Sequence, residues 1–574
     1  MHLEYRDGRY VLLLKKSQRQ IARQAGFNFD MHGAKHWYTT DWKRAAEFHH
    51  IAVGEALIRL DAHVAKLTAE LEASFAMLSD YKVPVPDLYH PKTGEKLDYL
   101  PYQKAGIQYA STRKYCLIAD PPGLGKTIQA VGIINNHRIQ SGIIFCPSGL
   151  KHNWKKEIEK WLVDKTLTVG IAEGDKVPDT DFVIINYDIA DRNYDALIRE
   201  EWGIIVCDES QIMSNPKAKR VMAILGKRFG KKFQKRPLQA WKWVFLSGTP
   251  ITKQPIQLWP IIQHCDPDGL GKDWETFVYR YCDAYNGAFG LVTDGGSNLS
   301  ELNEKLRLAF MVRRLKKHVL KHLPPKKRTV VLLPEEGLSN LIQTERDAFA
   351  HALAALEDMN EEIEKSDITR LDDLDPDFIL DQMATIFDGS FDQVGEHLDA
   401  GDLLPEFTAY SEARKELGLA KLPMVMRIVE RLVDEGYKVL VFAIHKEVIA
   451  RMYEAWPNSA RIVGGMTAKK VEKEKVRFQG WDDEGIDPDP LCDRILLNIK
   501  AGGVGHTLTK GTKIVKAELW AVPGDVEQCE DRAHRIGQDE EVEVIYPVVQ
   551  GTMDARTIES MIHRLEMIES AIDG

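Results

Sequence analysis

The sequence is poor in cysteine and has no long apolar run, and both shortages exclude classes of protein. Its seven cysteines are scattered without a CxxC pair, which argues against a zinc site or a disulfide framework. No stretch approaches the roughly 20 consecutive apolar residues of a membrane-spanning helix, and no signal-peptide pattern is present. We therefore expect an intracellular protein without membrane contact, in the cytoplasm or nucleoid of a bacterial or phage-infected cell, or in the nucleus of a eukaryote.

A positive net charge is also lacking, since 76 lysines and arginines face 86 acids, which gives a net charge of −10. The charges are segregated along the chain. Residues 217–236 hold nine cations and no acid, residues 313–328 hold eight cations, and residues 357–406 are rich in acids. Local basic surface is what binds phosphate, so an acidic chain can still hold nucleic acid through such patches. Each basic run therefore has two interpretations, a phosphate-binding patch or a solvated surface.

A glycine-rich turn at 120–127 reads DPPGLGKT, and it lies between an apolar run and a helix-like continuation. Strand, turn and helix in this order are the context of a phosphate-binding loop. Gly123 and Gly125 let backbone N–H groups approach phosphates. Lys126 can reach the terminal phosphates, and the Thr127 hydroxyl suits Mg²⁺. The full Walker pattern would need a glycine at position 120, so an incidental glycine-rich turn remains an alternative.

An acidic pair follows the apolar run 203–207, which is typical of a buried parallel strand. At the carboxyl end of such a strand, Asp208 suits a Mg²⁺ partner and Glu209 suits the base that orients the attacking water. Any single pair of this kind is also explained by two solvated acids. The phosphate loop and the sequence Ser-Gly-Thr at 247–249, which ends another apolar strand, favour the catalytic interpretation.

Arg532 and Arg535 lie three residues apart, about one helical turn, in the segment QCEDRAHRIGQ at 528–538. Two arginines at this spacing can reach one anion together. Taken alone, the segment is better explained as a solvated helix face. Its great distance from the phosphate loop along the chain indicates a composite site, in which one domain supplies the loop and another supplies the arginines.

Ten segments between about Leu100 and Gln550 follow one another in the order of the motifs of superfamily-two helicase-like ATPases. Among these the chain resembles the Swi/Snf-type DNA translocases, and the passages 310–331 and 517–538 are most similar to the HARP-like annealing-helicase branch. The matching segments are LPYQKAGIQYA (100–110), DPPGLGKTIQA (120–130), IIFCPSGLKHNWKKEIEKW (143–161), VIINYDIA (183–190), DESQ (208–211), LSGTPI (246–251), KVLVFAIHKEVIA (438–450), IVGGMT (462–467), AGGVGHTL (501–508) and QCEDRAHRIGQ (528–538).

The resemblance implies an ATP site between two lobes, with Arg532 and Arg535 as arginine fingers from the second lobe. It implies that Gln103 reads adenine, with Tyr102 or Tyr109 stacking nearby. The catalytic residues expected on this basis are Lys126, Asp208, Glu209, Arg532 and Arg535. The ATP-binding residues expected are Gln103, Gly123, Leu124, Gly125, Lys126, Thr127 and Gly505, and the Mg²⁺ ligands are Thr127 and Asp208.

The resemblance also implies contacts from loops to the DNA backbone, which position a motor without specifying sequence. Trp154 has a second interpretation, because a tryptophan at the start of a charged helix is often a packing residue. The residues expected to contact DNA are Pro147, Ser148, Asn153, Trp154, Ser247, Thr249, Gly464, Gly465, Thr467, Lys500, Gly502 and Gly503.

Three departures from the family pattern concern residues near these motifs. Pro121-Pro122 stands where many relatives have an acid and methionine, Ser210-Gln211 replaces the commoner Ala-His, and Asn498-Ile499 replaces Ser-Thr. None of them removes a catalytic group, so activity is expected.

Alternation of apolar strands with helical segments predicts an α/β fold with two RecA-like lobes, each built on a parallel sheet. In the N-terminal part, strands are expected at 26–30 and 35–39 and a helix over 42–80, capped by Asp41. The domains expected are a small α+β module with its linker at 1–95, lobe 1 at 96–262, helical protrusions with a basic run and the inter-lobe linker at 263–415, and lobe 2 at 416–574. Lobe strands are expected at 116–119, 143–146, 182–186, 204–207, 243–246, 439–443, 461–463, 494–498, 514–519 and 543–548.

We therefore expect an ATP-dependent translocase on double-stranded or forked DNA that remodels or reanneals it. The N-terminal module either contacts DNA or packs against the first lobe. Two alternatives stay open. One is a strand-separating helicase acting on DNA or RNA, and the other is an ATP-gated DNA clamp or a subunit of a repair or defence complex.

Overall fold

The structure, a computed structural model, describes most of the chain, and the chain divides into two compact units, Met1–Phe75 and Ala76–Gly574. Within the described ranges, no helix is long and apolar enough to cross a bilayer. The described ranges are 1–31, 35–89, 94–198, 201–229, 232–252, 254–287, 290–293, 295–359, 405–480, 491–499, 507–519 and 523–558, with Met561 and Ala571.

The first unit packs short helices and one long helix on a four-stranded antiparallel sheet of order β1-β2-β4-β3. Its core is formed by buried side chains of the sheet and the helices, among them Leu3, Tyr10, Phe27 and Leu60. The elements are β1 (His2–Arg6), β2 (Arg9–Leu13), α1 (Arg19–Gln24), β3 (Asn28–Phe29), β4 (Trp37–Thr39), α2 (Trp42–Ala46) and α3 (Glu55–Phe75).

The structure corrects the prediction for this unit at two places. The single helix expected over 42–80 is two helices, because the chain between α2 and α3 turns back onto β1, where the Val53 N–H donates to the Leu3 carbonyl at 2.9 Å. The hairpin of β1 and β2 was not expected. Asp7 and Gly8 connect its strands with φ angles of 49° and 79°, a two-residue turn for which Asp-Gly is a favoured sequence.

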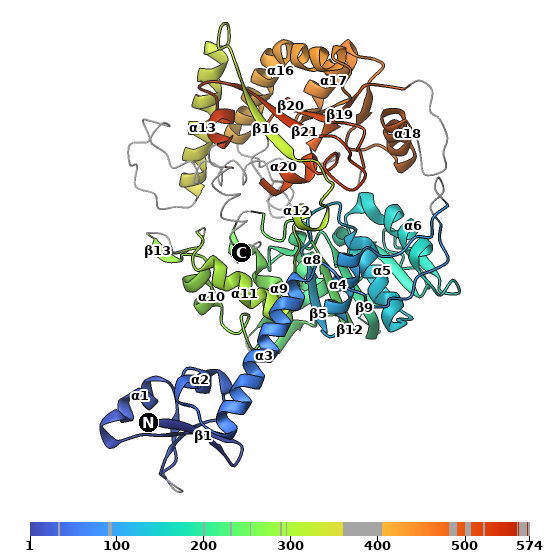
Figure 1. The fold of residues 1–574 in the computed structure, drawn as a ribbon. Helices are drawn as coiled ribbons and strands as arrows, with labels where there is room; N and C mark the ends of the chain where they lie inside the picture. The colour runs from blue at the N-terminus through green and yellow to red at the C-terminus, as the bar shows by residue number, and fades with distance from the viewer. Residues whose placement is uncertain are drawn as a thin grey trace. The chain divides into compact units, whose positions relative to one another are not determined.

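The first lobe of the second unit contains a seven-stranded parallel sheet of order β15-β5-β12-β9-β6-β8-β7, flanked by helices (Figure 1). All five strands expected here are present, and their continuous apolar runs are buried on both faces. β7 and β15 were not expected, because strands of three and two residues give no readable pattern. The elements are α4 (Pro101–Ser111), β5 (Tyr115–Ile118), α5 (Lys126–His137), β6 (Gly142–Cys146), α6 (Lys151–Trp161), β7 (Val169–Ile171), β8 (Phe182–Asn186), α7 (Tyr194–Leu197), β9 (Glu201–Asp208), α8 (Lys219–Leu225), β10 (Lys227–Phe229), β11 (Lys232–Lys235), β12 (Gln239–Leu246), α9 (Trp259–Cys265), α10 (Trp274–Tyr281), β13 (Tyr285–Gly287), β14 (Gly290–Val292), α11 (Leu299–Ala309), β15 (Met311–Val312) and α12 (Lys316–Val319).

Three adjacent strands of this sheet, β5, β12 and β9, end at a common edge, and each is followed by one of the sequence motifs described above. In the parallel register, Leu246 at the end of β12 pairs with Ile118 of β5 on one side and with Asp208 of β9 on the other. The loops that follow these three strands therefore start side by side at the carboxyl edge. In open parallel sheets this is the edge at which ligands bind.

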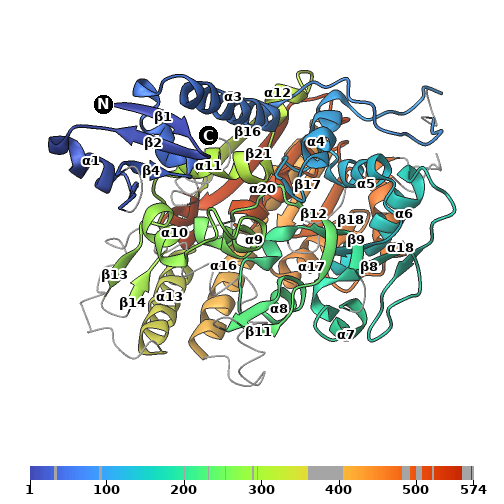
Figure 2. The ribbon, with the colours of Figure 1, turned by 90° about the horizontal axis from the view of Figure 1, so that it is seen from below.

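The second lobe contains a six-stranded parallel sheet of order β16-β21-β20-β17-β19-β18. The five strands expected here are present, with ends that differ by up to three residues. Figures 1 and 2 show α13 and α16 side by side, and Asp554 holds α16 through Lys421 at 2.7 Å. The elements are β16 (Lys326–Leu333), α13 (Ser339–Met359), α16 (Pro405–Asp434), β17 (Val439–Ala443), α17 (Lys446–Ala455), β18 (Ala460–Ile462), α18 (Ala468–Gln479), β19 (Arg494–Asn498), β20 (Lys513–Lys516), α20 (Pro523–Glu530) and β21 (Val542–Val549).

β16 adds an edge strand to this sheet from a part of the chain that was expected to be protrusion and linker. It pairs with β21 over its full length, from Lys326 opposite Val542 to Leu333 opposite Val549. The strand begins inside the basic run and most of its side chains are partly or fully exposed, which hid it in the sequence. The sheet of the second lobe is therefore built from two separate stretches of chain.

Two tryptophans on β12 allow a matched test of the first lobe's core. Trp243 is 2% exposed and packs on His264 and Phe245 with ring centroids 4.5 and 5.9 Å away, whereas Trp241 is 53% exposed. We expect Trp243→Ala to lower the free energy of unfolding by about 3–5 kcal/mol, because it leaves a cavity. Trp241→Ala should cost less than about 1 kcal/mol. Urea unfolding of both variants measures the difference, and equal losses would contradict this account of the core.

Candidate functional site

The glycine-rich loop connects β5 to α5, and two of its glycines have left-handed backbone. Gly123 has a φ of 88° and Gly125 a φ of 73°, a region in which residues with a Cβ are strained. A Cβ on Gly125 would lie 2.5 Å from Nε2 of Gln103, so this position has no room for a side chain. The loop thus takes the tight turn that lets backbone N–H groups face a phosphate at the start of α5.

α4 braces the loop through Gln103 and Tyr102. The Gln103 Nε2 and the Tyr102 hydroxyl donate to the Leu124 carbonyl at 3.2 and 3.1 Å, and the Gln103 Oε1 accepts from the Leu100 N–H at 2.9 Å. Tyr109 donates its hydroxyl to the Arg307 carbonyl at 2.6 Å and is buried. In this conformation all three side chains that were expected near adenine support the protein, and adenine recognition by Gln103 stays a prediction.

Lys126 opens α5 and lies close to the acidic pair. Its ammonium donates to the Asp120 carbonyl at 2.9 Å. Burial lowers the pKa of Lys126, while the charges of Glu209 and Asp208 oppose that shift. Thr127 follows in the first turn of α5 and is partly exposed. The cation and hydroxyl expected to meet phosphate and Mg²⁺ are therefore next to the acids that would complete the site.

Asp208 ends β9 in a buried position. Its Oδ2 accepts from the Trp154 indole N–H at 2.7 Å, and its Oδ1 accepts from the Glu209 N–H at 3.0 Å. Burial and the neighbouring charge of Glu209 raise the pKa of Asp208 to about 7. A buried carboxylate with a raised pKa, beside the second carboxylate of Glu209, fits a divalent cation, whose oxygen ligands include carboxylates and hydroxyls. Asp208 and Thr127 are the residues that would hold Mg²⁺.

Glu209 is held by side chains from both lobes. Its Oε2 accepts from Gln211 Nε2 at 2.8 Å and from Gln528 Nε2, on α20 of the second lobe, at 3.3 Å. Gln211 continues the contacts, because its Oε1 accepts from the Ser247 hydroxyl at 2.7 Å. Glu209 also has a φ of 49°, a left-handed conformation that is uncommon for a residue with a side chain and is found at functional sites.

The two arginines do not share a helix. α20 ends at Glu530, and Arg532 and Arg535 lie in the turns that follow, so the expected one-turn helical spacing is wrong. Gln538 fixes these turns, since its Nε2 donates to the carbonyls of Thr509 and Gly511 at 2.9 and 3.2 Å. α20 therefore ends in a bend instead of continuing as a helix through Arg535.

That bend brings Arg535 against the loop of the other lobe. A Cβ on Gly123 would lie 2.6 Å from the Arg535 Cβ, so the absence of a side chain at Gly123 permits the approach. Arg532 is 5% exposed, and its Nε donates to the Gln528 carbonyl at 3.1 Å. Burial and the adjacent charge of Arg532 lower the pKa of Arg535 to about 10. Arg535 therefore lies against the phosphate loop, and Arg532 lies close enough to Glu209 to interact with its charge.

The residues expected to contact DNA fall into three groups. Ser148, Asn153, Gly464, Gly465 and Thr467 are exposed and Pro147 is partly exposed. Asn153 lies in the first turn of α6, and the others lie in the segments that follow β6 and β18 at the carboxyl edges. Trp154, Ser247 and Thr249 are buried, because they contact the acidic pair or its neighbours, so they offer DNA no surface in this conformation. Lys500, Gly502 and Gly503, together with Gly505 of the ATP set, lie outside the described residues.

The two basic runs have different surroundings. Residues 217–236 lead through the β10–β11 hairpin into the start of β12, so the hairpin is at the amino edge, away from the phosphate loop. In the run 313–328, Arg314 is buried, and Lys316 and Lys326 are only 10% and 13% exposed in ion pairs. These three cations do not form the phosphate-binding surface that the composition suggested.

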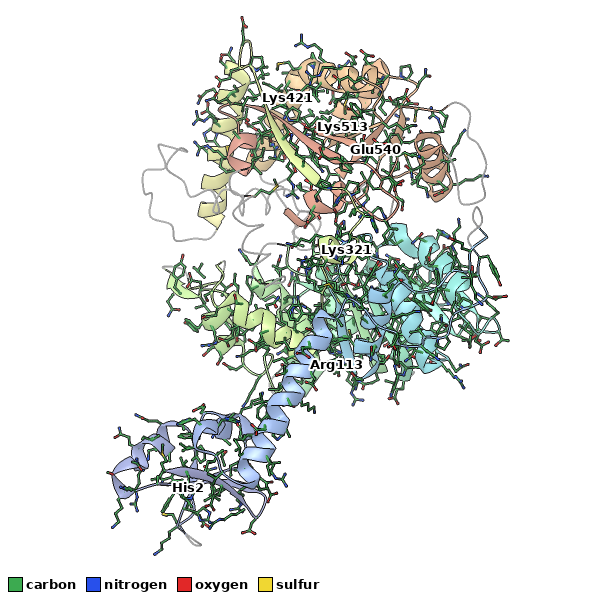
Figure 3. The ribbon with its side chains drawn as sticks, in the orientation of Figure 1. His2, Arg113, Lys321, Lys421, Lys513 and Glu540 are labelled. Carbon is green, nitrogen blue, oxygen red and sulfur yellow. The ribbon has the colours of Figure 1, made fainter. Side chains whose placement is uncertain are left out.

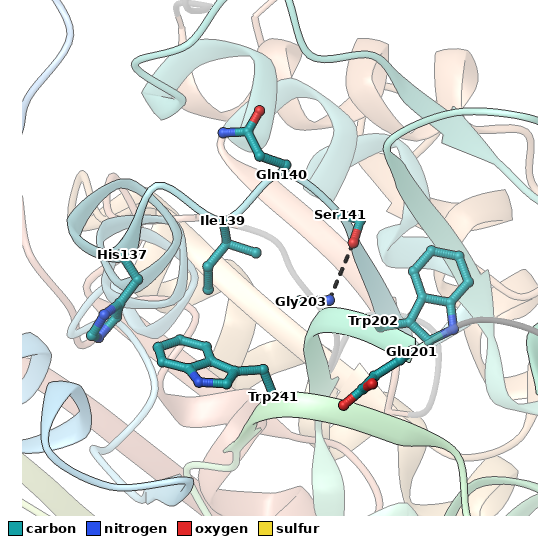
Figure 4. A pocket seen from close by; sticks show the side chains of 8 residues that line it. All are labelled: His137, Ile139, Gln140, Ser141, Glu201, Trp202, Gly203 and Trp241. Carbon is teal, nitrogen blue, oxygen red and sulfur yellow. Dashed lines mark hydrogen bonds between the residues drawn. The ribbon is translucent and has the colours of Figure 1, made fainter.

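Figure 4 shows a pocket of about 430 Å³ at the amino edge of the same sheet, where β6 and β9 begin. Trp241 borders it and packs edge-on against His137 with ring centroids 5.0 Å apart. All parallel strands start at this edge, so the pocket is separated from the phosphate loop by the length of the sheet. It contains none of the predicted site residues. Its lining is His137, Ile139, Gln140, Ser141, Glu201, Trp202, Gly203 and Trp241.

Family profiles match both lobes in sequence. The SNF2-related domain matches residues 101–371, and the helicase conserved C-terminal domain matches residues 420–537. The chain belongs to the SNF2-related ATPases. The phosphate loop lies in the first matched domain and the two arginines lie in the second.

Curated relatives align with most of this SNF2-related chain. The mouse DNA annealing helicase and endonuclease ZRANB3 is 29% identical over 83% of this chain and 41% of its own length. The SWI/SNF-related matrix-associated actin-dependent regulator of chromatin subfamily A-like protein 1 of Xenopus tropicalis is 28% identical over 82% of this chain and 45% of its own length. The chain therefore spans less than half the length of these relatives.

Among solved structures, the Sulfolobus solfataricus SWI2/SNF2 ATPase core in complex with dsDNA is 20% identical to the chain. It covers 87% of this chain and 99% of its own, with a TM-score of 0.37.

Sequence reasoning missed several side chains of this site. Gln211 was noted as a departure from the family pattern and Gln528 as part of a motif, but neither was assigned a contact. Both are glutamines within four residues of a predicted catalytic residue, and this proximity is the sequence signal that could have identified them. Trp154 was expected at DNA, whereas its hydrogen bond to Asp208, 54 residues away in the chain, depends on tertiary packing and leaves no mark in the sequence.

Gly123→Ala tests the approach of the second lobe to the loop. We expect at least a ~10-fold loss of ATP turnover, because the new methyl group would displace Arg535 from the phosphates. Gly337→Ala is the matched control. Its φ of 81° imposes similar backbone strain, about 1–2 kcal/mol, but no atom lies within 4 Å of the added Cβ. Steady-state ATPase assays compare the two, and an equal effect would assign the loss to strain alone.

Proposed function

We propose that this SNF2-related chain is a DNA-stimulated ATPase that translocates on double-stranded or forked DNA and remodels or reanneals it. The observation that carries the proposal is the meeting of Gln528 with Glu209 and of Arg535 with Gly123. Each contact joins the second lobe to the first at the phosphate loop or its acidic pair. Groups for hydrolysis therefore assemble only when the two lobes are together.

The proposed reaction divides the work between the lobes. Lys126 and the loop N–H groups bind the terminal phosphates of ATP, and Asp208 with Thr127 holds Mg²⁺, which neutralises charge on the phosphate oxygens. Glu209 orients the attacking water, and Gln211 and Gln528 orient Glu209. Arg532 and Arg535 stabilise the charge that develops in the transition state.

Release of that charge after hydrolysis would weaken the hold of Arg532 and Arg535 on the first lobe, so the lobes can separate in each cycle. The exposed segments after β6 and β18, which include Ser148 and Thr467, lie at the carboxyl edges of the two sheets. If each lobe contacts the DNA backbone through its own segment, opening and closing of the lobes moves one DNA contact relative to the other. Backbone contacts suit a motor that steps along any sequence.

The comparisons support the remodelling part of the proposal. Relatives that align over more than four fifths of this chain bear the name DNA annealing helicase. The endonuclease in the same printed name is a property of proteins more than twice as long as the aligned stretch, and it is not part of the proposal for this chain.

Substitutions in the composite site test the reaction. Lys126→Ala, Glu209→Gln and Arg535→Ala should each lower DNA-stimulated ATP hydrolysis at least ~10²-fold, because each removes a group that acts on the transition state. Glu541→Gln and Arg427→Ala make the same chemical changes at exposed positions and should leave turnover unchanged. Steady-state kinetics at saturating DNA decide, and wild-type turnover in all three site variants would overturn the mechanism.

The kind of DNA and the kind of work are tested together. ATP hydrolysis should rise most with duplex or forked DNA and less with single strands, and the stimulation should weaken as salt displaces phosphate contacts. The protein should displace a third strand from an intact triplex and anneal complementary strands. Unwinding of a tailed duplex would favour the strand-separating helicase, and tight ATP-dependent binding without triplex displacement would favour the clamp.

A further inference from the structure

The stretch Arg313–Arg328, called the bridging segment below, connects the end of the first lobe's sheet to the start of β16 in the second lobe's sheet. Figure 3 labels Lys321 within it, where the chain passes from one lobe to the other. Its high positive charge suggested a DNA-binding patch. The side chains show a different use, because its buried cations contact residues on both sides of the ATP site. Arg314 contacts the side of the phosphate loop, and Lys316 and Lys326 contact the side of the two arginines.

The first set of contacts of the bridging segment is with the glycine-rich loop. Arg314 and Asp120 form an ion pair in which both side chains are 0% exposed. The Arg314 N–H and Nε each donate to Asp120 Oδ1 at 3.0 Å, and Arg314 Nη1 donates to the Tyr102 carbonyl at 2.9 Å. Gln129 closes the group, since its Nε2 donates to Asp120 Oδ2 at 2.9 Å and its Oε1 accepts from Arg314 at 2.8 Å.

These contacts hold Asp120, whose backbone carbonyl accepts from Lys126, so they act on the loop where phosphate is proposed to bind. Burial alone would raise the pKa of Asp120, but the charge and hydrogen bonds of Arg314 hold it below the ordinary value. Gly106 on α4 makes the space, because a Cβ there would lie 2.1 Å from Gln129 Oε1. Arg313 adds a second contact, donating to the Ala119 and Gly248 carbonyls at 2.5 and 3.0 Å.

The second set of contacts is with Glu530 and Asp531, the two acids that directly precede Arg532. Lys316 pairs with Asp531 at 2.9 Å and donates to the His534 carbonyl at 2.7 Å. Lys326 pairs with Glu530 at 2.7 Å. His534 returns the contact, with its Nε2 2.8 Å from the Pro324 carbonyl. Three of these contacted residues lie within two positions of Arg532.

Arg328, near the start of β16, belongs to the same set of contacts and pairs with Glu530 at 2.7 Å. Burial would raise the pKa of Glu530, but the charges of Lys326 and Arg328 hold it well below its ordinary value. A buried carboxylate that stays charged keeps its partners at fixed distances, because separating them would leave an uncompensated charge away from water. The turns that carry Arg532 are therefore tied to the bridging segment rather than to α20 alone.

We propose that the bridging segment is a positioning element that sets Arg532 and Arg535 against the phosphate loop, with Arg314 holding the loop side and Lys316 and Lys326 holding the arginine side. The proposal rests on the proposed ATPase function and deepens it. One stretch of chain contacts both halves of the site, so a shift on either side is transmitted to the other without any contact between these cations and ATP or DNA.

Adjacent lysines give a matched test. Lys316→Met removes the buried charge that pairs with Asp531, whereas Lys317→Met makes the same change at an exposed neighbour. We expect Lys316→Met to lower kcat at saturating DNA at least ~10-fold, since small displacements of catalytic groups have effects of this size. The KM for ATP should change less than about twofold, because the arginines act on the transition state. Lys317→Met should keep wild-type kcat.

Reciprocal substitution tests the specific ion pair. Asp531→Asn should lower kcat at least as much, because it removes the pair with Lys316 and also a weaker pair with Lys326 at 3.4 Å. The double variant Lys316→Met/Asp531→Asn should be no slower than Asp531→Asn, because the two side chains share one ion pair. Additive losses would contradict the pairing. If Lys316→Met does not fold, the double variant, which buries no unpaired charge at this contact, decides the matter: a wild-type kcat in it overturns the proposal.

DNA binding separates the proposal from the basic-patch interpretation. The affinity of Lys316→Met for a fluorescent duplex, and the salt dependence of that affinity, should match wild type. Weaker DNA binding with an unchanged kcat at saturating DNA would make the segment a DNA surface and overturn the proposal. Wild-type turnover in Lys126→Ala, Glu209→Gln and Arg535→Ala alike would overturn the proposed function, and the positioning role with it. An inactive Glu209→Gln beside a wild-type Lys316→Met would overturn the positioning role alone.

Discussion

The contact of Arg535 with Gly123 is the constraint on which the rest of the site depends. It places the main chain of the second lobe so close to the phosphate loop that a single methyl group would fill the gap. At that distance Gln528 reaches Glu209, and Arg532 interacts with the charge of Glu209. In the proposed reaction, catalysis is a property of the pair of lobes, since the first lobe has the loop and the acids and the second lobe has the two arginines.

Buried charge holds the bridging segment in place at the junction of the lobes. Arg314, Lys316 and Lys326 are each paired with carboxylates in surroundings from which water is mostly excluded. Such pairs contribute little net stability, because desolvation offsets their attraction, but breaking one is costly. Apolar surfaces tolerate sliding, whereas paired charges have one favourable arrangement. A junction of this kind suits a site in which catalytic groups from two domains must return to the same positions in every cycle.

Much of the fold was predictable because its strands are continuous apolar runs. The five strands expected in each lobe are present, and the α/β class and family are confirmed. Short or exposed strands were missed, as were the pairing of Asp120 with Arg314, 194 residues apart, and the burial of Trp154. These depend on tertiary packing, which gives no local pattern. The roles of Lys126, Asp208, Glu209 and the two arginines remain predictions, although the structure brings these residues together.

The pairing of β16 with β21 has a consequence for how the chain folds. The first lobe's sheet is complete once Val312 has been synthesised, so that lobe can form early on the ribosome. The second sheet needs β16 and β21, whose paired residues are more than 200 positions apart. β16 must therefore wait, unpaired and rich in lysine and arginine, until Val549 has emerged. Its charges make it a poor partner for other strand edges during that interval, which protects the half-made protein from aggregation.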